Sequence, residues 1–253
     1  MKETEPYRHA YTIVSGATGG IGRAICSFLA SEGIPLVLAC RSRDKAMQLM
    51  ATLPPAKELP HRFVPLDLSD TQSIHRAAEE FSGLTLCGII NNAGTMRRNF
   101  GTDSSGRELT MAVNYHNTRL LNELLLPALP DNASVVLTTS ITRLLPQPGG
   151  DNVDERHFGQ LSTYAMSKRR LTEWAARFCA ENPRLRVNCA DPGVVDSGMI
   201  TMHRWYDPLA DIFFRPLIRK PRQGAEPAIR AYFAKGSGRI YCRFLSHPLP
   251  DIR

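Results

Sequence analysis

The sequence predicts a single α/β domain built on a doubly wound parallel sheet of about seven strands, with helices on both faces. The chain has 253 residues, of which 43% are hydrophobic, and this suits one domain with a large core. Short apolar segments alternate with amphipathic helical patterns, which is typical of a parallel sheet covered on both sides. We find no linker, repeat or low-complexity segment in the sequence, so residues 1–253 are expected to form one domain.

The strands are predicted from short apolar runs that end at turn-forming residues. The first run, YTIVS, leads directly into a glycine-rich turn, and Asp191-Pro192-Gly193 breaks the sixth. The expected strands are residues 11–15, 36–39, 62–65, 86–90, 134–139, 186–190 and 238–241.

The helices are predicted from apolar residues that recur every three or four positions. Gly33 ends the first helix, Pro54 stops the second, Ser69 or Asp70 caps the third, and Pro127 stops the long fourth. The first expected helix begins at residue 21. Four of the others cover residues 41–52, 71–81, 107–126 and 222–233, and one carries Tyr164 and Lys168 and ends at about residue 181.

The candidate motifs gather at one edge of the predicted sheet. Right-handed crossovers place all carboxyl ends of parallel strands along a single edge. In a Rossmann-like fold of this kind, ligands bind at that edge, where the strand order reverses. Each motif described below lies at the carboxyl end of an expected strand or at the start of the following helix, so we expect a functional site there.

Charge and composition narrow the classes of partner. The formal net charge is +7, and much of the basic excess lies after residue 200. An anionic substrate, a membrane surface or nucleic acid would each suit such charge. A solvated surface is the favoured interpretation, because no nucleic-acid-binding motif accompanies it. We therefore expect no nucleic-acid partner.

The expected location is cytoplasmic. The first ten residues lack the apolar core of a signal peptide, and no run of eighteen apolar residues occurs. The six cysteines lie far apart without a C-x-x-C pair, which fits reduced thiols better than disulfides or zinc. The histidines show no metal-ligand spacing, so we expect no metal.

The glycine-rich turn after the first strand is a candidate phosphate site. Gly16, Gly20 and Gly22 follow the strand and open a helix, where backbone N–H groups can approach a pyrophosphate. The spacing is G-x-x-x-G-x-G rather than G-x-G-x-x-G, and no Gly-Lys-Ser/Thr follows to make a P-loop. A plain tight turn is the alternative interpretation, and the strand–turn–helix context favours nucleotide binding.

The end of the second strand indicates NADP(H) rather than NAD(H). An acidic residue at this point binds the adenosine ribose in NAD-dependent folds, whereas an Arg accommodates a 2′-phosphate. Here the strand ends with Cys40 and Arg41, and Asp44 already belongs to the next helix. The guanidinium of Arg41 suits a phosphate. The alternative is that Arg41 and Arg43 are solvated charges.

Tyr164 and Lys168 form a candidate proton-transfer pair. They lie four residues apart on a predicted helix and therefore on the same face. An ammonium beside a phenol favours the phenolate and is expected to lower a pKa that starts near about 10. Such a phenol can exchange protons at cellular pH. Taken alone, the pair is weak, because i,i+4 pairs are common.

Together, these motifs resemble the short-chain dehydrogenase/reductase family nearly end to end. The matching segments, in the family's order, are SGATGGIG at 15–22, Asp67, NNAG at 91–94, Asn114, Ser140, the Tyr164–Lys168 pair, and PGVVDS at 192–197. Ser15 and Ser197 replace the threonines usual in that family. The Ala39-Cys40-Arg41 stretch, residues 105–108, the long spacer between Ser140 and Tyr164, and residues 222–226 are similar to the retinol-dehydrogenase-like branch.

The resemblance implies an oxidoreductase that transfers the 4-pro-S hydride between NADP(H) and a carbonyl or alcohol. Tyr164 would exchange the proton, Lys168 would lower the pKa of Tyr164 and hold the ribose, Ser140 would donate to the substrate oxygen, and Asn114 would hold a water in a proton relay. The implied cofactor-binding residues are Gly16, Thr18, Gly20, Ile21, Gly22, Arg41, Asp67, Leu68, Asn92, Ala93, Gly94, Tyr164, Lys168, Pro192, Gly193, Val195 and Ser197.

Residues 1–95 are expected to be mainly cofactor-binding, and residues 96–253 to supply the catalytic groups and the substrate wall. The aromatic segment 196–220 is the expected substrate loop. It suits an apolar lid for a lipophilic carbonyl or alcohol or a simple cover over the core, with a homo-oligomer contact or membrane contact through 199–220 as less favoured alternatives. The rival function is a non-catalytic NADP-binding sensor or scaffold, which has no need of the four catalytic residues together.

Overall fold

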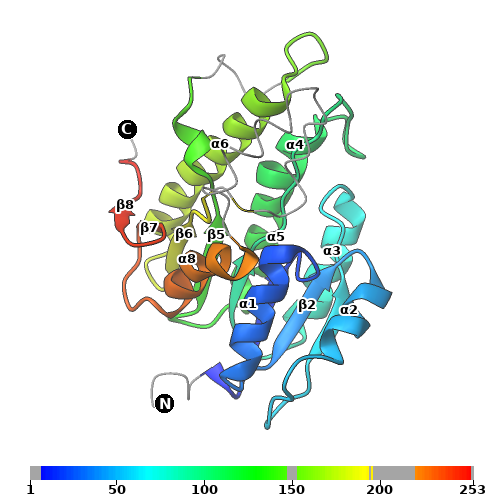
Figure 1. The fold of residues 1–253 in the computed structure, drawn as a ribbon, viewed down its shortest axis with the longest axis vertical. Helices are drawn as coiled ribbons and strands as arrows, with labels where there is room; N and C mark the ends of the chain where they lie inside the picture. Colours follow the sequence, from blue (N-terminus) through cyan, green and yellow to red (C-terminus); the bar gives the residue numbers. More distant parts are fainter. Residues whose placement is uncertain (1–6, 147–152, 194, 196–219, 252–253) are drawn as a thin grey trace.

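The computed structural model describes residues 7–146, 153–193, 195 and 220–251 (Figure 1). They form one eight-stranded sheet in the order β3-β2-β1-β4-β5-β6-β7-β8. The strands are β1 Tyr11–Ser15, β2 Leu36–Cys40, β3 Arg62–Pro65, β4 Leu86–Asn91, β5 Ser134–Thr138, β6 Arg186–Ala190, β7 Arg239–Tyr241 and β8 Ser246–Pro248. The predicted doubly wound α/β fold is confirmed. The expected count of about seven misses β8, which pairs antiparallel with β7.

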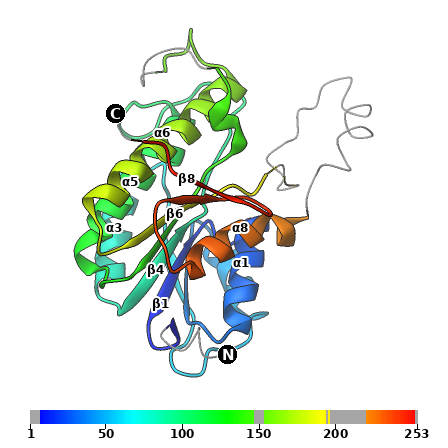
Figure 2. The same ribbon diagram turned by 90° about the vertical axis from the view of Figure 1, so that its left-hand side faces the viewer.

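Helices cover both faces of the sheet. Figure 2 shows α3, α5 and α6 on one side and α1 and α8 on the other. The helical elements are α1 Gly20–Ser31, α2 Arg43–Met50, α3 Thr71–Ser82, α4 Leu109–Met111, η2 Ala112–His116, α5 Asn117–Leu125, η3 Leu126–Ala128, η4 Ile141–Leu144, α6 Gln160–Glu181 and α8 Pro221–Phe233. Strand order reverses between β1 and β4, as the doubly wound topology requires.

Local capping explains most of the helix ends. Gly33 follows α1 with φ +79, a conformation that glycine adopts without steric cost. Ser42 accepts a hydrogen bond from the Lys45 N–H, so α2 begins at Arg43 and not at Arg41 as expected. Asp70 caps α3, which decides between the two predicted caps.

The long helix predicted over residues 107–126 is interrupted. Its first turn, α4, passes into a π-helical turn, η2, before α5 and a final 3₁₀ turn that contains Pro127. The Thr118 hydroxyl donates to the Val113 carbonyl five residues earlier. Wide π turns of this kind often mark functional sites, and this one carries Asn114.

Two apolar clusters fill the space between the sheet and its helices. One cluster packs Ile74 and Phe81 of α3, Leu121 of α5 and Trp174 of α6 against the sheet. The other joins α1, α2 and α8 to the opposite face. Every residue of β1, β2 and β5 is buried, as expected for central strands covered on both sides.

A glycine in β4 permits the close approach of this strand to β5. The register shifts where Tyr11 pairs with Leu86 and Thr12 with Gly88, so Cys87 is an extra residue in β4. A Cβ at Gly88 would meet the Ser134 carbonyl oxygen and lie 3.0 Å from the Ser134 nitrogen in β5. Glycine is therefore required at this position by the backbone of the neighbouring strand.

We expect Gly88→Ala to lower the free energy of unfolding by about 3 kcal/mol, because the new methyl group overpacks rigid backbone. Gly236→Ala is the matched control, since nothing lies within 4 Å of a Cβ there, and its effect should stay within about 0.5 kcal/mol. Urea denaturation of both variants measures the difference. Equal effects would contradict the proposed role of Gly88.

Candidate active site

The glycine turn after β1 is held against the end of β4. Gly16 has φ +63, and a Cβ on it would lie 2.8 Å from the Ala93 Cα. A Cβ on Gly22 would meet the Gly16 carbonyl oxygen. Helix α1 starts after Gly19 without a side-chain cap, so its first N–H groups stay available to an anion. Thr18 lies in this turn, and Gly20 and Ile21 open the helix.

Asn92 stabilises the turn rather than lining a pocket. Its side-chain amide donates to the Ser15 carbonyl at 3.1 Å and to the Gly16 carbonyl at 3.2 Å. The Ala93 N–H donates to the Ser15 hydroxyl at 3.0 Å. These three hydrogen bonds tie the ends of β1 and β4 together. Asn92, an expected cofactor-binding residue, therefore holds the backbone of the glycine turn in place.

Six residues expected to bind a cofactor line one pocket of about 180 Å³. They are Gly16, Arg41, Asp67, Leu68, Ala93 and Gly94. They come from the carboxyl ends of four neighbouring strands, β1 to β4, at the point where strand order reverses. The pocket therefore lies where the topology predicts a ligand.

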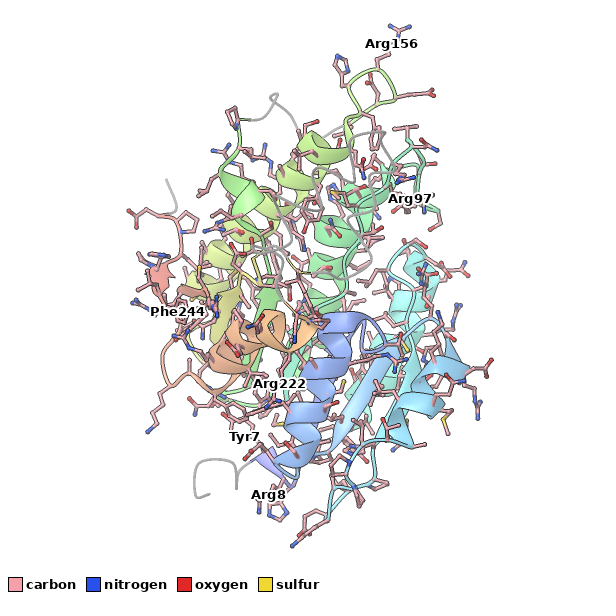
Figure 3. The ribbon with its side chains drawn as sticks, viewed as in Figure 1. Tyr7, Arg8, Arg97, Arg156, Arg222 and Phe244 are labelled. Atoms are coloured by element: carbon pink, nitrogen blue, oxygen red, sulfur yellow. The ribbon has the colours of Figure 1, made fainter. Side chains whose placement is uncertain are left out.

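The pocket is also lined by residues that were not predicted from the sequence. Arg97, labelled near α4 in Figure 3, lines the wall with Arg41. Asp67 accepts hydrogen bonds from the Ser69 N–H at 2.9 Å and the Ser69 hydroxyl at 2.7 Å. The position of Arg97 shortly after the NNAG segment at 91–94 was the sequence feature that could have predicted its place in this pocket. The other lining residues that were not predicted are Cys40, Leu66, Ser69, Thr95, Leu109 and Val113.

Lys168 is buried and points at the end of β5. Its side chain is 3% exposed, and the Nζ donates to the Thr138 carbonyl at 2.7 Å. The same Nζ lies 5.7 Å from the centroid of the Tyr164 ring. The predicted helix and its shared face are confirmed, because α6 runs from Gln160 to Glu181 and carries both residues.

The expected lowering of the Tyr164 pKa by Lys168 is wrong for this structure. Burial raises the pKa of Tyr164 to about 12, and the charge of Asp191 acts in the same direction, while a hydrogen bond from Ser140 opposes them. Burial lowers the pKa of Lys168 to about 8. Removal from water disfavours the charged form of both groups, and this effect exceeds the attraction that the i,i+4 spacing suggests.

Ser140 has two roles in the structure. Its hydroxyl caps η4 by accepting from the Thr142 N–H at 3.3 Å, and a hydrogen bond with it lowers the Tyr164 pKa. Ser140 is buried at the carboxyl end of β5. The end of β5 therefore places a hydroxyl beside the phenol.

Asn114 is locked by its neighbours. Its side-chain oxygen accepts from the Thr95 N–H at 2.8 Å, and its amide donates to the Thr95 carbonyl at 2.8 Å and to the Ser167 hydroxyl at 2.9 Å. A Cβ on Gly94 would lie 3.3 Å from the Asn114 oxygen and 3.5 Å from the Lys168 Nζ. The π turn thus connects the end of β4 to α6, and the water relay stays a prediction.

The segment after β6 is partly described. Gly193 has φ +71 and follows Pro192, and its N–H donates to Asp191 at 2.9 Å. Val195 is buried and lies against Gly224 of α8. Residues 196–219 of the expected substrate loop, which include Ser197 and most of the segment considered for a less favoured membrane contact, lie outside the described residues.

The residues present fit a nicotinamide dinucleotide. Glycines without room for a Cβ line the turn, uncapped N–H groups start α1, and two arginines and a carboxylate share the pocket. The buried Thr138 hydroxyl has no hydrogen-bond partner among the described residues. Within the same residues, no cluster of three His, Cys, Asp or Glu side chains could hold a metal ion.

No helix in the described part of the chain is both long and apolar enough to span a bilayer.

Comparison with known proteins identifies relatives along most of the chain. The family model described as short chain dehydrogenase matches residues 10–205. Polyprenol dehydrogenase from Mus musculus is 31% identical over 250 residues, which cover 91% of this chain and 74% of that protein. Retinol dehydrogenase 11 from Homo sapiens is 29% identical over 239 residues, which cover 88% of this chain and 73% of that protein.

Solved structures show the same fold at lower identity. A short chain dehydrogenase from Salmonella enterica superposes with a TM-score of 0.72 at 22% identity, covering 94% of this chain and 96% of the other. Salutaridine reductase from Papaver somniferum gives 0.69 at 21% identity, covering 92% and 99%. The architecture described above is therefore shared with these proteins.

The buried Lys168 should make the free energy of unfolding depend on pH. Burial lowers its folded pKa to about 8, below the unfolded value of about 10.4. Between these values the unfolded chain binds more protons, so this group's contribution to stability rises with pH. Lys168→Met removes this titrating group. The free energy of unfolding of the variant minus that of the wild type should therefore fall by about 2 kcal/mol from pH 7 to pH 10.

Urea denaturation at each pH measures this difference, with Lys45→Met at an exposed position of α2 as the control. A difference for Lys168→Met that stays constant with pH would show that the ammonium is not desolvated.

Proposed function

Because the chain belongs to the short-chain dehydrogenase/reductase family, we propose that it transfers a hydride between NADP(H) and a carbonyl or alcohol carbon. The family match spans residues 10–205 and makes the chain an oxidoreductase. The resemblance to the retinol-dehydrogenase-like branch is confirmed by the curated relatives. The observation that carries the proposal is that α6 places Tyr164 beside the buried Lys168 at the strand edge that also forms the pocket lined by Arg41 and Asp67.

The cofactor would be held by the glycine turn, the start of α1 and the pocket lined by Arg41 and Asp67. When bound, it supplies the hydride, and the protein supplies orientation and polarisation. We assign residues 1–95 mainly to this binding and residues 96–253 to the catalytic groups and the substrate wall. Arg41 and Arg97 support NADP(H), because two guanidinium groups on one pocket suit an additional phosphate.

Tyr164 would give a proton to the developing alkoxide during carbonyl reduction. A pKa near about 12 keeps this phenol protonated at neutral pH, which suits the donor role. Alcohol oxidation needs the phenolate, so its rate should rise with pH. Ser140 would donate a hydrogen bond to the substrate oxygen, Lys168 would hold the ribose hydroxyls, and Asn114 would keep the π turn aligned with α6.

A lipophilic carbonyl or alcohol is the proposed substrate class. Ile141 and Leu144, which follow Ser140 in η4, are 58% and 71% exposed, and Leu161 at the start of α6 is 53% exposed. The elements η4 and α6 pack against each other, and these exposed apolar side chains belong to the element that Ser140 caps and to the element that carries Tyr164. The names of the relatives, polyprenol and retinol dehydrogenase, support the same class.

The rival proposal is a non-catalytic NADP-binding sensor or scaffold. It would use the glycine turn and Arg41 but would gain nothing from a buried Lys168 beside Tyr164. Binding of NADPH without turnover of any carbonyl would favour it. The cytoplasmic location stays a prediction, and a homo-oligomer contact stays a less favoured alternative.

We expect Tyr164→Phe to lower turnover roughly 100- to 10,000-fold, because proton transfer to the substrate oxygen is lost. Binding of NADPH should persist. NADPH consumption over a panel of ketones and aldehydes of graded size and polarity measures turnover, and Tyr241→Phe on β7 is the control. Near-normal turnover by a folded Tyr164→Phe protein would overturn the mechanism.

Arg41→Ala should weaken binding of NADPH relative to NADH by roughly 10- to 100-fold, since a charge-assisted hydrogen bond to the 2′-phosphate is lost. Arg43→Ala serves as the matched control, because Arg43 begins α2 and does not line the pocket. Fluorescence titration with both nucleotides gives the two dissociation constants. An equal effect on NADH and NADPH, or a wild-type preference for NADH, would reject the NADP assignment.

A further inference from the structure

An ion pair joins two loops that lie 48 residues apart in the sequence. The Arg143 Nη1 lies 2.9 Å from the Asp191 Oδ2, and the two side chains are only 13% and 5% exposed. By contrast, the Arg119–Glu123 pair is 46% and 41% exposed. Desolvation can cost more than a buried pair returns in attraction, so such a pair is weak evidence for stability. Its location suggests another role.

The same two side chains also fix the backbone on both sides. The Arg143 Nη1 donates to the Ser140 carbonyl at 2.9 Å. The Asp191 Oδ1 accepts from the Gly193 N–H at 2.9 Å. One ion pair therefore orients the strand end that carries the Ser140 hydroxyl and the turn that carries Pro192 and Gly193.

Among the residues that the structure describes, few charges surround the Tyr164 hydroxyl. Lys168 comes from α6, Arg143 from η4 and Asp191 from the end of β6, and Cys189 of β6 lies close to Lys168, Arg143 and Asp191. Asp191 disfavours ionisation of Tyr164. Arg143 carries the opposite charge and lies in contact with Asp191. The two side chains therefore shift the Tyr164 pKa in opposite directions, and each offsets the other.

We propose that Arg143 and Asp191 are positioning residues of the active site, which lock the Ser140 loop to the Pro192–Gly193 turn and balance the charge next to Tyr164. This inference rests on the proposed function, because it assigns the pair to the hydride-transfer reaction. Neither residue needs to touch the substrate. Both act through Ser140, Gly193 and the phenol.

The charge balance predicts shifts of opposite sign. Asp191→Asn keeps the oxygen that accepts from Gly193 but removes the negative charge, so the pKa of Tyr164 should fall by roughly one unit. Arg143→Gln leaves the carboxylate uncompensated, so the pKa should rise. Lys168 has a pKa of about 8 and is already neutral where Tyr164 titrates, so a change at Lys168 does not reverse either sign.

The test is titration of Tyr164 by NMR in the cofactor-free protein labelled with carbon-13 at tyrosine Cζ, with the signal assigned by its loss in Tyr164→Phe. The pH profile of kcat/KM for alcohol oxidation is the second readout, and it should move in the same two directions. Arg143→Lys keeps the charge and should restore a profile near that of the wild type. The charge-free double variant Arg143→Gln/Asp191→Asn should lie between the two single variants.

The Arg107–Asp103 pair provides the control, because its carboxylate side chain is fully buried and it lies in another loop. Arg107→Gln and Asp103→Asn should reduce stability without moving the Tyr164 titration. Shifts of the same sign in both active-site variants, or no shift in either, would overturn the proposal. Since the NMR titration needs no turnover, inactivity of the wild type on every substrate would count against the proposed function and leave this test intact.

Discussion

The hydrogen bond from the Lys168 ammonium to the Thr138 carbonyl fixes the position of α6 against the carboxyl end of β5. The bond is 2.7 Å long and lies out of reach of water. A buried ammonium without such an acceptor would be strongly unfavourable, so α6 must pack with this end of the helix against the strand edge. Tyr164, one turn earlier, and Ser140, two residues after Thr138, are then brought together as a consequence.

Burial also decides the protonation of these groups. The charged forms of Tyr164 and Lys168 are both disfavoured by removal from water, so the phenol stays protonated and the amine titrates near about 8. A pattern of residues on a helix face shows which groups are neighbours but not how much solvent they lose. For this reason the sequence predicted correctly that Tyr164 and Lys168 share a helix face and predicted the wrong direction for the Tyr164 pKa shift.

The elements with strong local signals were predictable. Five-residue apolar strands, Gly33 after α1 and a cap at Ser69 or Asp70 before α3 follow from periodicity and capping alone. Right-handed crossovers also predicted that the carboxyl ends of the parallel strands lie along one edge of the sheet. The three-residue strand β8 and the π turn have no comparable local signal, and the Arg143–Asp191 pair depends on two adjacent strands whose ends are distant in sequence.

The attachment of Asn92 to Ser15 and Gly16 has a consequence for ligand association. Because protein hydrogen bonds already hold the glycine turn in its bent form, an incoming dinucleotide meets a preorganised cradle. Little conformational entropy is then lost in this part of the chain on association. Differences in affinity between nucleotides should therefore arise mainly from the groups that face the ligand directly, and the turn itself should discriminate little between them.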